Sequence, residues 1–204
     1  MATELKSEDQ KFSYGLGQSV GQNFKNEGFG EALEIDAFLG GLSDAFAGQS
    51  ELSMEEINEV LQKRIGEIKA GAHKEVKEAG EKFLAENAKR DEITTLPSGL
   101  QYEIIESGDA AGTKPSASSQ VTTHYTGQLI DGRVFDSSVQ RGQPATFPVN
   151  GVIAGWTEAL QLMVPGDKWK LYIPFDLAYG ERGAGQDIPP FAALIFDIEL
   201  ISVA

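Results

Sequence analysis

The prolines of this chain divide it into two parts that must fold differently. All eight lie at or after Pro97 in a sequence of 204 residues, and the residues before Pro97 contain none. Proline interrupts a helix because it removes a hydrogen bond and clashes with the preceding turn, so its absence allows long helices. The sequence therefore predicts a helical part followed by a part of another class, joined near residue 93.

The proline-free part carries the signals of three helices. Capping boxes, in which a Ser is followed three residues later by Gln or Glu, predict helix starts at Ser7 and Ser53. Apolar residues recur at helical spacing in each segment, and Gly48 gives a stop for the second helix, expected over residues 36–47. The third runs to about Arg90, and its second half carries so many charges that we expect a solvated rod.

Three glycines, Gly66, Gly71 and Gly80, interrupt the third predicted helix. Each costs about 1 kcal/mol relative to Ala, so we expect a compliant helix. Alanine at all three positions should raise the melting temperature of the helical part. His73, in the same helix, is expected to be a solvated side chain.

The first two predicted helices are short and rich in Phe. A unit of this size buries only a thin core by itself, and pairing with a second copy would cover its apolar faces. We therefore predict a homodimer through residues 1–60, since closed two-fold dimers are the commonest oligomers. The predicted domains are a helical dimerisation domain over 1–52, a connecting helix over 53–92 whose start packs in the dimer domain, and a further domain over 93–204.

From Ile93 onward apolar residues repeat at every second position, which indicates strands. Strands are expected over 100–106, 120–127, 129–135, 168–173 and 193–200. An Asp131-Gly132 hairpin signal lies inside the third of these segments, and one short helix is expected over 155–162. This pattern is typical of an α+β domain, in which an antiparallel sheet wraps on one short helix.

The composition excludes several classes of function. The chain has no Cys and only two His, so disulfides, thiolate catalysis and structural zinc are not expected. Its 31 acidic residues against 17 basic ones give a net charge of -14, which argues against binding of nucleic acid or an anionic membrane. Because no segment has the pattern of a signal peptide or a spanning helix, we expect a cytoplasmic protein. We also expect no metal and no cofactor.

Six motifs follow one another through the second part. They are His124-Tyr125-Thr126-Gly127, Asp131-Gly132-Arg133-Val134-Phe135-Asp136-Ser137-Ser138, Val152-Ile153-Ala154-Gly155-Trp156, Ala178-Tyr179-Gly180, Ile188-Pro189-Pro190 and Leu194-Ile195-Phe196-Asp197. In this order and spacing they resemble the FKBP-type peptidyl-prolyl cis-trans isomerases. The helical part before them is similar to the Mip-like bacterial branch of that family, which joins a dimerisation domain, a long helix and an isomerase domain.

The resemblance implies a substrate pocket and the residues that form it. The implied catalytic residues are Tyr125, Phe135, Asp136, Trp156, Tyr179 and Phe196, and the implied substrate-binding residues are Arg141, Phe147, Val152, Ile153 and Ile188. Trp156 would lie under the proline ring, and the Tyr179 hydroxyl would reach a substrate carbonyl. Asp136 could pair with Arg141 at the rim.

Ala145 and the loop over residues 181–187 depart from the family pattern, and His124 lies in a family motif without an expected role in the pocket. Ala145 stands where the family often has an aromatic residue, so this wall of the pocket is expected to be more open. The loop over residues 181–187 also departs from the family, because it has no aromatic residue and no His that could contact the residues flanking the substrate proline. His124 is expected to be a packed or hydrogen-bonded strand residue without a role in catalysis.

The implied activity needs no nucleophile, general base or metal. Rotation about an X-Pro bond is slow because it breaks amide resonance, with a barrier of about 18–20 kcal/mol. A dry apolar pocket favours the twisted, less dipolar amide, which is differential binding of the transition state. Catalysis of this kind would assist folding of chains limited by X-Pro bonds.

The same resemblance implies partners and leaves alternatives open. The partners would be unfolded or partly folded proteins with X-Pro bonds, held by a chaperone-like dimeric clamp, and macrolide-type inhibitors. Removing residues 1–92 should spare activity on short peptides and weaken activity on proteins. Two alternatives are a non-catalytic holdase or binding module for unfolded chains, and a receptor for macrolide-type ligands.

Overall fold

The computed structural model describes residues 5–204, which form two compact units that meet at Ala72 and His73. Residues 1–4 of the predicted dimer segment lie outside the described residues. One helix, α3 (Met54–Asn87), begins in the first unit and ends in the second. Over residues 5–204, no helix is both long enough and apolar enough to cross a membrane.

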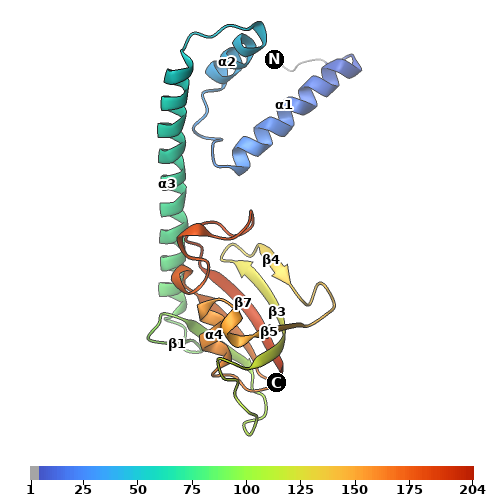
Figure 1. Ribbon diagram of the computed structural model, residues 1–204, viewed down its shortest axis with the longest axis vertical. Helices are drawn as coiled ribbons and strands as arrows, with labels where there is room; N and C mark the ends of the chain where they lie inside the picture. The colour runs from blue at the N-terminus through green and yellow to red at the C-terminus, as the bar shows by residue number, and fades with distance from the viewer. Residues whose placement is uncertain (1–4) are drawn as a thin grey trace. The chain divides into compact units, whose positions relative to one another are not determined.

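The first unit consists of α1 (Glu8–Asn26), α2 (Ile35–Ala47) and the first half of α3 (Figure 1). Both predicted capping boxes are confirmed. The Gln10 backbone N–H donates to the Ser7 hydroxyl at 3.2 Å, and the Glu56 N–H donates to the Ser53 hydroxyl at 3.2 Å. The second helix ends at Gly48 with a φ of 69°, the left-handed conformation that glycine adopts without a steric penalty.

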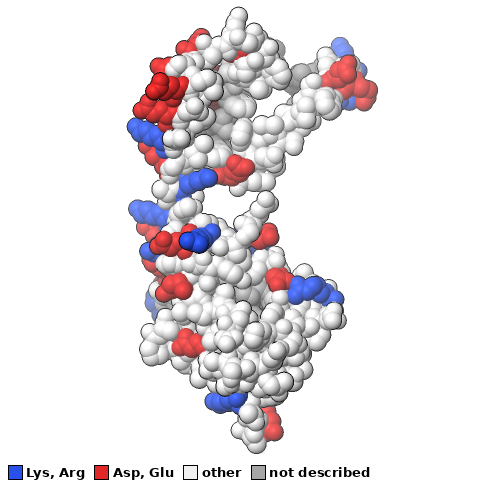
Figure 2. All heavy atoms as spheres, viewed as in Figure 1, with Lys and Arg blue, Asp and Glu red and all other residues white. Residues whose placement is uncertain are grey.

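The helices of the first unit leave their apolar side chains uncovered. No residue of α1 or α2 is buried, and Phe12 and Phe46 are 68% and 87% exposed. Phe24 makes edge-on ring contacts with Phe29 and Phe38, at 6.3 and 5.5 Å between ring centres. Figure 2 shows charged side chains near the N-terminal end of α1 and uncharged surface along its middle.

The second unit is built on one antiparallel sheet of seven strands. The strands are β1 (Thr94–Thr95), β2 (Gln101–Glu106), β3 (Gln120–Leu129), β4 (Val134–Ser137), β5 (Ala145–Pro148), β6 (Lys168–Ile173) and β7 (Leu194–Val203). Their order across the sheet is β1-β2-β6-β7-β3-β4, and β5 pairs with the first half of β3. The α+β fold with one short helix is therefore confirmed.

The short helix α4 (Ala154–Leu160) packs against one face of the sheet and closes the core (Figure 1). Trp156 and Leu160 of α4 are buried with Leu171 and Leu194 of the strands. Gly155 allows the close approach, because a Cβ there would lie only 2.6 Å from a methyl carbon of Ile173. Short 3-10 turns complete this unit at Val149–Gly151, Phe175–Leu177 and Gly180–Arg182.

The second half of α3 is not the solvated rod that its charges predicted. Gly80 and Asn87 are buried, and Val76 packs against the core of the second unit. A Cβ at Gly80 would lie 3.1 Å from the Cβ of Ala193, and the His73 ring contacts the Phe191 ring at 5.8 Å. One narrow face of the second half of α3 is therefore covered by the second unit, while the charged side chains occupy the other faces of the helix.

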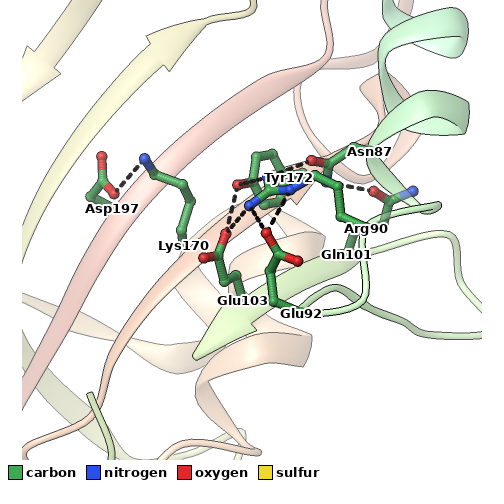
Figure 3. A network of polar contacts seen from close by, with 8 residues as sticks. All are labelled: Asn87, Arg90, Glu92, Gln101, Glu103, Lys170, Tyr172 and Asp197. Carbon is green, nitrogen blue, oxygen red and sulfur yellow. Dashed lines mark hydrogen bonds and ion pairs between the residues drawn. The ribbon is translucent and has the colours of Figure 1, made fainter. Parts of the chain in front are cut away.

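Polar contacts fix the end of α3 to the sheet (Figure 3). The Asn87 side-chain amide donates to the Gln101 side-chain oxygen at 2.9 Å, and Gln101 donates to the Leu84 carbonyl at 2.9 Å. The Arg90 guanidinium donates to the Tyr172 hydroxyl at 3.0 Å and to Glu103 at 2.9 Å. These contacts join α3 to β2 and β6, so the helix end and the sheet form one folded unit.

Two strands went unpredicted, and several ends differ by a few residues. β1 has two residues, and β5 has four and ends in Pro148, so neither is long enough to give a strong strand pattern. The hairpin predicted at Asp131-Gly132 is present, because the Gly132 N–H donates to the Leu129 carbonyl at 3.0 Å. Of the two, β5 matters for function, because it contributes Phe147 to an apolar cavity.

Candidate functional site

An apolar cavity of about 420 Å³ lies between α4 and the sheet. It is lined by Tyr125, Phe135, Asp136, Phe147, Gly151, Val152, Ile153, Trp156, Tyr179 and Phe196. Its volume lies within the range of small-molecule sites, about 300–1,000 Å³. A smaller depression of about 210 Å³ includes His124, Lys168 and Glu199.

Trp156 forms the buried centre of the cavity wall. It belongs to the first turn of α4 and is 4% exposed. The rings of Tyr125, Phe147 and Phe196 meet it edge to face, with ring centres 5.2, 5.9 and 5.2 Å away. Aromatic pairs prefer this edge-to-face arrangement. The base of the cavity is therefore aromatic and apolar.

Phe135 extends the aromatic wall from β4, with its ring centre 5.6 Å from that of Phe196. Gly127 of β3 makes room for this pair, because a Cβ there would lie 2.6 Å from both rings. Val152 and Ile153 precede α4 and complete the apolar lining. Glycine on β3 is thus a requirement of the ring packing.

Polar groups gather at one rim of the cavity. The Tyr125 hydroxyl donates to Asp136 at 2.5 Å, and the Arg141 guanidinium donates to Asp136 and, at 3.0 Å, to the Tyr125 oxygen. Arg141 does not line the cavity itself, but it holds two residues that do. The predicted pairing of Asp136 with Arg141 is therefore present.

The rim groups keep defined protonation states at neutral pH. Partial burial opposes ionisation of Asp136, but hydrogen bonds from Tyr125 and Arg141 outweigh it, and the pKa of Asp136 is lowered. Burial raises the pKa of Tyr125, and the hydrogen bond to Asp136 raises it further. Burial and the Asp136 charge also raise the pKa of Tyr179. Asp136 is therefore an ionised acceptor, and both tyrosines keep their hydroxyl protons.

Ile188 is not among the residues that line the cavity. It belongs to the loop after Tyr179, is buried in the core, and pairs through its backbone with Ala184 by hydrogen bonds of 2.9 and 3.1 Å. Its substrate contact therefore stays a prediction. Ala145 packs against the core and does not line the cavity.

Two residues near the cavity were not singled out from the sequence. Gly151 lines it, and a Cβ there would lie 2.7 Å from Pro148. The Asn150-Gly151 pair is a turn signal that could have indicated this position. Ser138 is fully buried, and its hydroxyl accepts the Tyr125 N–H at 2.8 Å and contacts His124 Nδ1 at 3.0 Å. His124 is therefore a hydrogen-bonded strand residue, as predicted.

Comparisons with known proteins agree with this geometry. Residues 111–201 match the family model described as FKBP-type peptidyl-prolyl cis-trans isomerase. Residues 9–104 match the model of the domain amino terminal to that isomerase. Together the two models span both units of the chain.

Similar proteins match over nearly the whole chain. The FKBP-type 22 kDa peptidyl-prolyl cis-trans isomerase of Escherichia coli is 45% identical over 195 residues, covering 94% of this chain and 93% of the relative. The outer membrane protein MIP of Legionella longbeachae is 46% identical, covering 99% and 88%. The crystal structure of FkpA from Escherichia coli superposes with a TM-score of 0.72 at 37% identity, covering 98% of both chains.

Proposed function

The chain belongs to the FKBP-type peptidyl-prolyl cis-trans isomerases, and on that premise we propose that the cavity around Trp156 catalyses X-Pro rotation by binding the twisted amide. The observation that carries this proposal is the cavity itself, an apolar volume of about 420 Å³ with an aromatic base and a single polar rim. A proline ring fits such a site because its own surface is apolar. The proposed mechanism needs no nucleophile from the lining.

The lining favours the transition state over the planar substrate. Twisting the amide makes its nitrogen pyramidal and shrinks the C–O dipole, so the twisted form loses less when water is removed from it. Binding that is stronger for this form lowers the barrier of about 18–20 kcal/mol. The proline ring would rest on Trp156, with Phe135 and Phe196 beside it.

Polar groups at the edge of the cavity would orient the peptide on either side of the proline. Tyr179 lines the cavity, and the raised pKa of its hydroxyl keeps it a donor for a substrate carbonyl. Ile153 immediately precedes α4, where backbone N–H groups have no partner within the helix and can bind a second carbonyl. Asp136 would face the rotating carbonyl as an ionised group held by Tyr125 and Arg141.

Substitution of the aromatic wall tests the catalytic proposal. Phe135→Ala should lower kcat/KM on a short X-Pro peptide by at least about tenfold, because it removes an apolar wall that the twisted amide uses. Ile104→Ala is a matched control, since Ile104 is exposed on β2 away from the cavity. Equal kcat/KM for Phe135→Ala and the wild type would refute the proposal.

We also propose that the chain is a homodimer through residues 1–60. The support is the exposed apolar surface of the first unit, where no residue of α1 or α2 is buried. A large uncovered apolar surface marks an interaction site in a folded protein. A Cβ added at Gly17 or Gly21 of α1 would meet no heavy atom within 4 Å, which leaves room for a partner helix on that side.

The dimer would place two isomerase sites on one particle that can hold one folding chain. A single small cavity binds a short peptide weakly, and a second site on the same chain adds effective concentration. This chaperone-like clamp would therefore act on unfolded or partly folded proteins more than on short peptides. The connecting helix α3 would join the dimer segment to each site.

A full-chain variant tests the clamp. Phe12→Glu places a charge in the exposed stripe of α1 and should convert the dimer to a monomer in light scattering. Its activity on an X-Pro peptide should be retained, while acceleration of a proline-limited refolding reaction should fall. Ile201→Glu, at an exposed site on β7, is the control. A dimer that persists, or a monomer that refolds proteins as fast as wild type, would contradict the clamp.

A second candidate is a holdase that binds unfolded chains without catalysis. The exposed Phe side chains of the first unit favour it, because such surface can bind apolar segments. Asp136→Ala separates the two functions. Loss of peptide turnover with full suppression of aggregation would support the holdase as an independent activity, whereas parallel loss of both would support the isomerase.

A further inference from the structure

Phe191 holds a backbone conformation that its residue type disfavours. Its φ is 62°, and within residues 5–204 it is the one non-glycine residue with a positive φ. It is the third residue of the turn Pro189-Pro190-Phe191-Ala192, which the Ala192 N–H closes on the Pro189 carbonyl at 3.4 Å. Turns with a positive φ at this position favour Gly or Asn, because a larger side chain crowds the backbone there. Contacts beyond the turn must therefore hold Phe191.

The Phe191 ring has three such contacts. It meets the Phe175 ring edge to face at 5.3 Å, and the His73 ring of α3 lies 5.8 Å away. The Lys77 ammonium, one turn further along α3, lies 5.4 Å from the Phe175 ring centre and 5.9 Å from that of Phe191. A cation placed near two ring faces attracts both. The second half of α3 and Phe175 therefore fix the position of the Phe191 ring. The packed ring in turn keeps the Phe191 backbone at its positive φ.

Phe191 contacts the chain both before and after Tyr179. Phe175 opens the 3-10 turn Phe175–Leu177, which leads into Tyr179. The Phe191 N–H donates to the carbonyl of Gly180, the residue after Tyr179, at 3.0 Å. The ring of Phe191 thus contacts the chain before Tyr179, and its backbone contacts the chain after it.

We infer that Phe191 is a positioning residue for the isomerase site, which keeps Tyr179 on the cavity wall and couples it to the connecting helix through His73 and Lys77. Tyr179 depends on such support, because its side chain is 40% exposed and its hydroxyl has no hydrogen bond among residues 5–204. The inference rests on the proposed substrate contact of Tyr179. By this inference α3 helps to position Tyr179 although the helix itself does not contact the substrate.

Two substitutions at residue 191 separate backbone conformation from ring packing. Both Phe191→Ala and Phe191→Asn remove the ring. Alanine disfavours a positive φ, whereas asparagine tolerates it. Phe191→Ala should lower kcat/KM on an X-Pro peptide about fivefold, roughly the worth of one hydrogen bond. Phe191→Asn should recover most of that loss. An unchanged kcat/KM in Phe191→Ala, or equal losses in both variants, would overturn the inference.

A double-mutant cycle tests whether the effect passes through Tyr179. In a Tyr179→Phe background, Phe191→Ala should cause little further loss, because both substitutions remove the same substrate contact. Losses that multiply would show a general effect on stability and overturn the inference. A wild-type chain that does not accelerate isomerisation would instead refute the proposed function, so the two failures are distinguishable.

The helix side is tested in the full chain as well. Combined His73→Ala and Lys77→Ala should lower kcat/KM about twofold or more with Phe191 present, and should have no effect in the Phe191→Asn background, where the backbone no longer needs an anchor. Glu55→Ala and Lys63→Ala, two exposed charge changes in the first half of α3, form the control pair. An equal loss with and without Phe191 would contradict the role of α3.

Discussion

The three glycines of α3 have different surroundings, and their replacement tests how this helix is held. A Cβ at Gly66 or Gly71 would meet no heavy atom within 4 Å. A Cβ at Gly80 would lie 3.1 Å from the Ala193 Cβ and 3.5 Å from the Ala193 nitrogen. The sequence predicted that alanine stabilises at all three positions, and the structure restricts that prediction to Gly66 and Gly71.

The magnitudes follow from these distances. Alanine at an exposed helix position gains about 1 kcal/mol over glycine, and about 4–8 °C in melting temperature for a unit of 60–100 residues. Gly66→Ala and Gly71→Ala should each show this gain in the first unit. At Gly80 the same gain is offset by overpacking against the Ala193 Cβ at 3.1 Å, which costs about 1–3 kcal/mol. Gly80→Ala should therefore be neutral or lose up to about 2 kcal/mol.

Thermal and urea unfolding followed by circular dichroism give the comparison, with near-ultraviolet ellipticity reporting the second unit. Protein concentration must be equal throughout, because association of copies shifts the melting temperature. A Gly80→Ala variant stabilised as much as Gly66→Ala would refute the packing of α3 on Ala193. It would also remove the support for α3 in the isomerase site.

Three further predictions concern the second unit. Asn87→Ala removes the donor that lies 2.9 Å from the buried Gln101 amide oxygen, and it should lower the free energy of unfolding in urea by about 1–3 kcal/mol. The control Asn58→Ala, on the exposed surface of α3, should lower it by less than about 0.5 kcal/mol. Equal effects of the two substitutions would contradict the buried hydrogen bond. Because the pKa of Asp136 is lowered in the folded chain, its charge contributes stability above its unfolded pKa that is lost as pH falls through the folded pKa. The stability difference between wild type and Asp136→Asn should therefore shrink as pH falls from about 7 to 2, and a constant difference would contradict the rim contacts. A macrolide-type ligand should bind the cavity and change Trp156 fluorescence, and binding that is unaffected by Phe135→Ala would place it elsewhere.

The helix starts could be predicted from sequence because local chemistry determines them. The capping boxes at Ser7 and Ser53 and the glycine stop at Gly48 need no tertiary information. The second half of α3 could not be predicted in the same way. Its covered stripe includes Gly80 and Asn87, which carry little apolar signal, and burial there depends on the loop before β7.

The site residues likewise fall into those that sequence motifs predicted and those that depend on tertiary contacts. Motif order located most of the cavity lining, and the structure brings Tyr125, Phe135 and Tyr179 together around Trp156 as the motifs implied. Ile188 differs, because the loop turns its side chain into the core. The Pro189-Pro190 pair could have indicated a turn, but nothing indicated the positive φ of Phe191, since contacts with a helix more than a hundred residues earlier in the chain hold it.

The most direct test of the account is kcat/KM of the full chain on a peptide with a bulky apolar residue before proline, measured in H2O and in D2O. Binding of a twisted amide in an apolar cavity predicts strong acceleration that is nearly the same in both solvents, because no proton is transferred in the rate-determining step. Absence of acceleration would contradict the isomerase function. Acceleration that falls several-fold in D2O would contradict the mechanism and indicate proton transfer by a group such as Asp136.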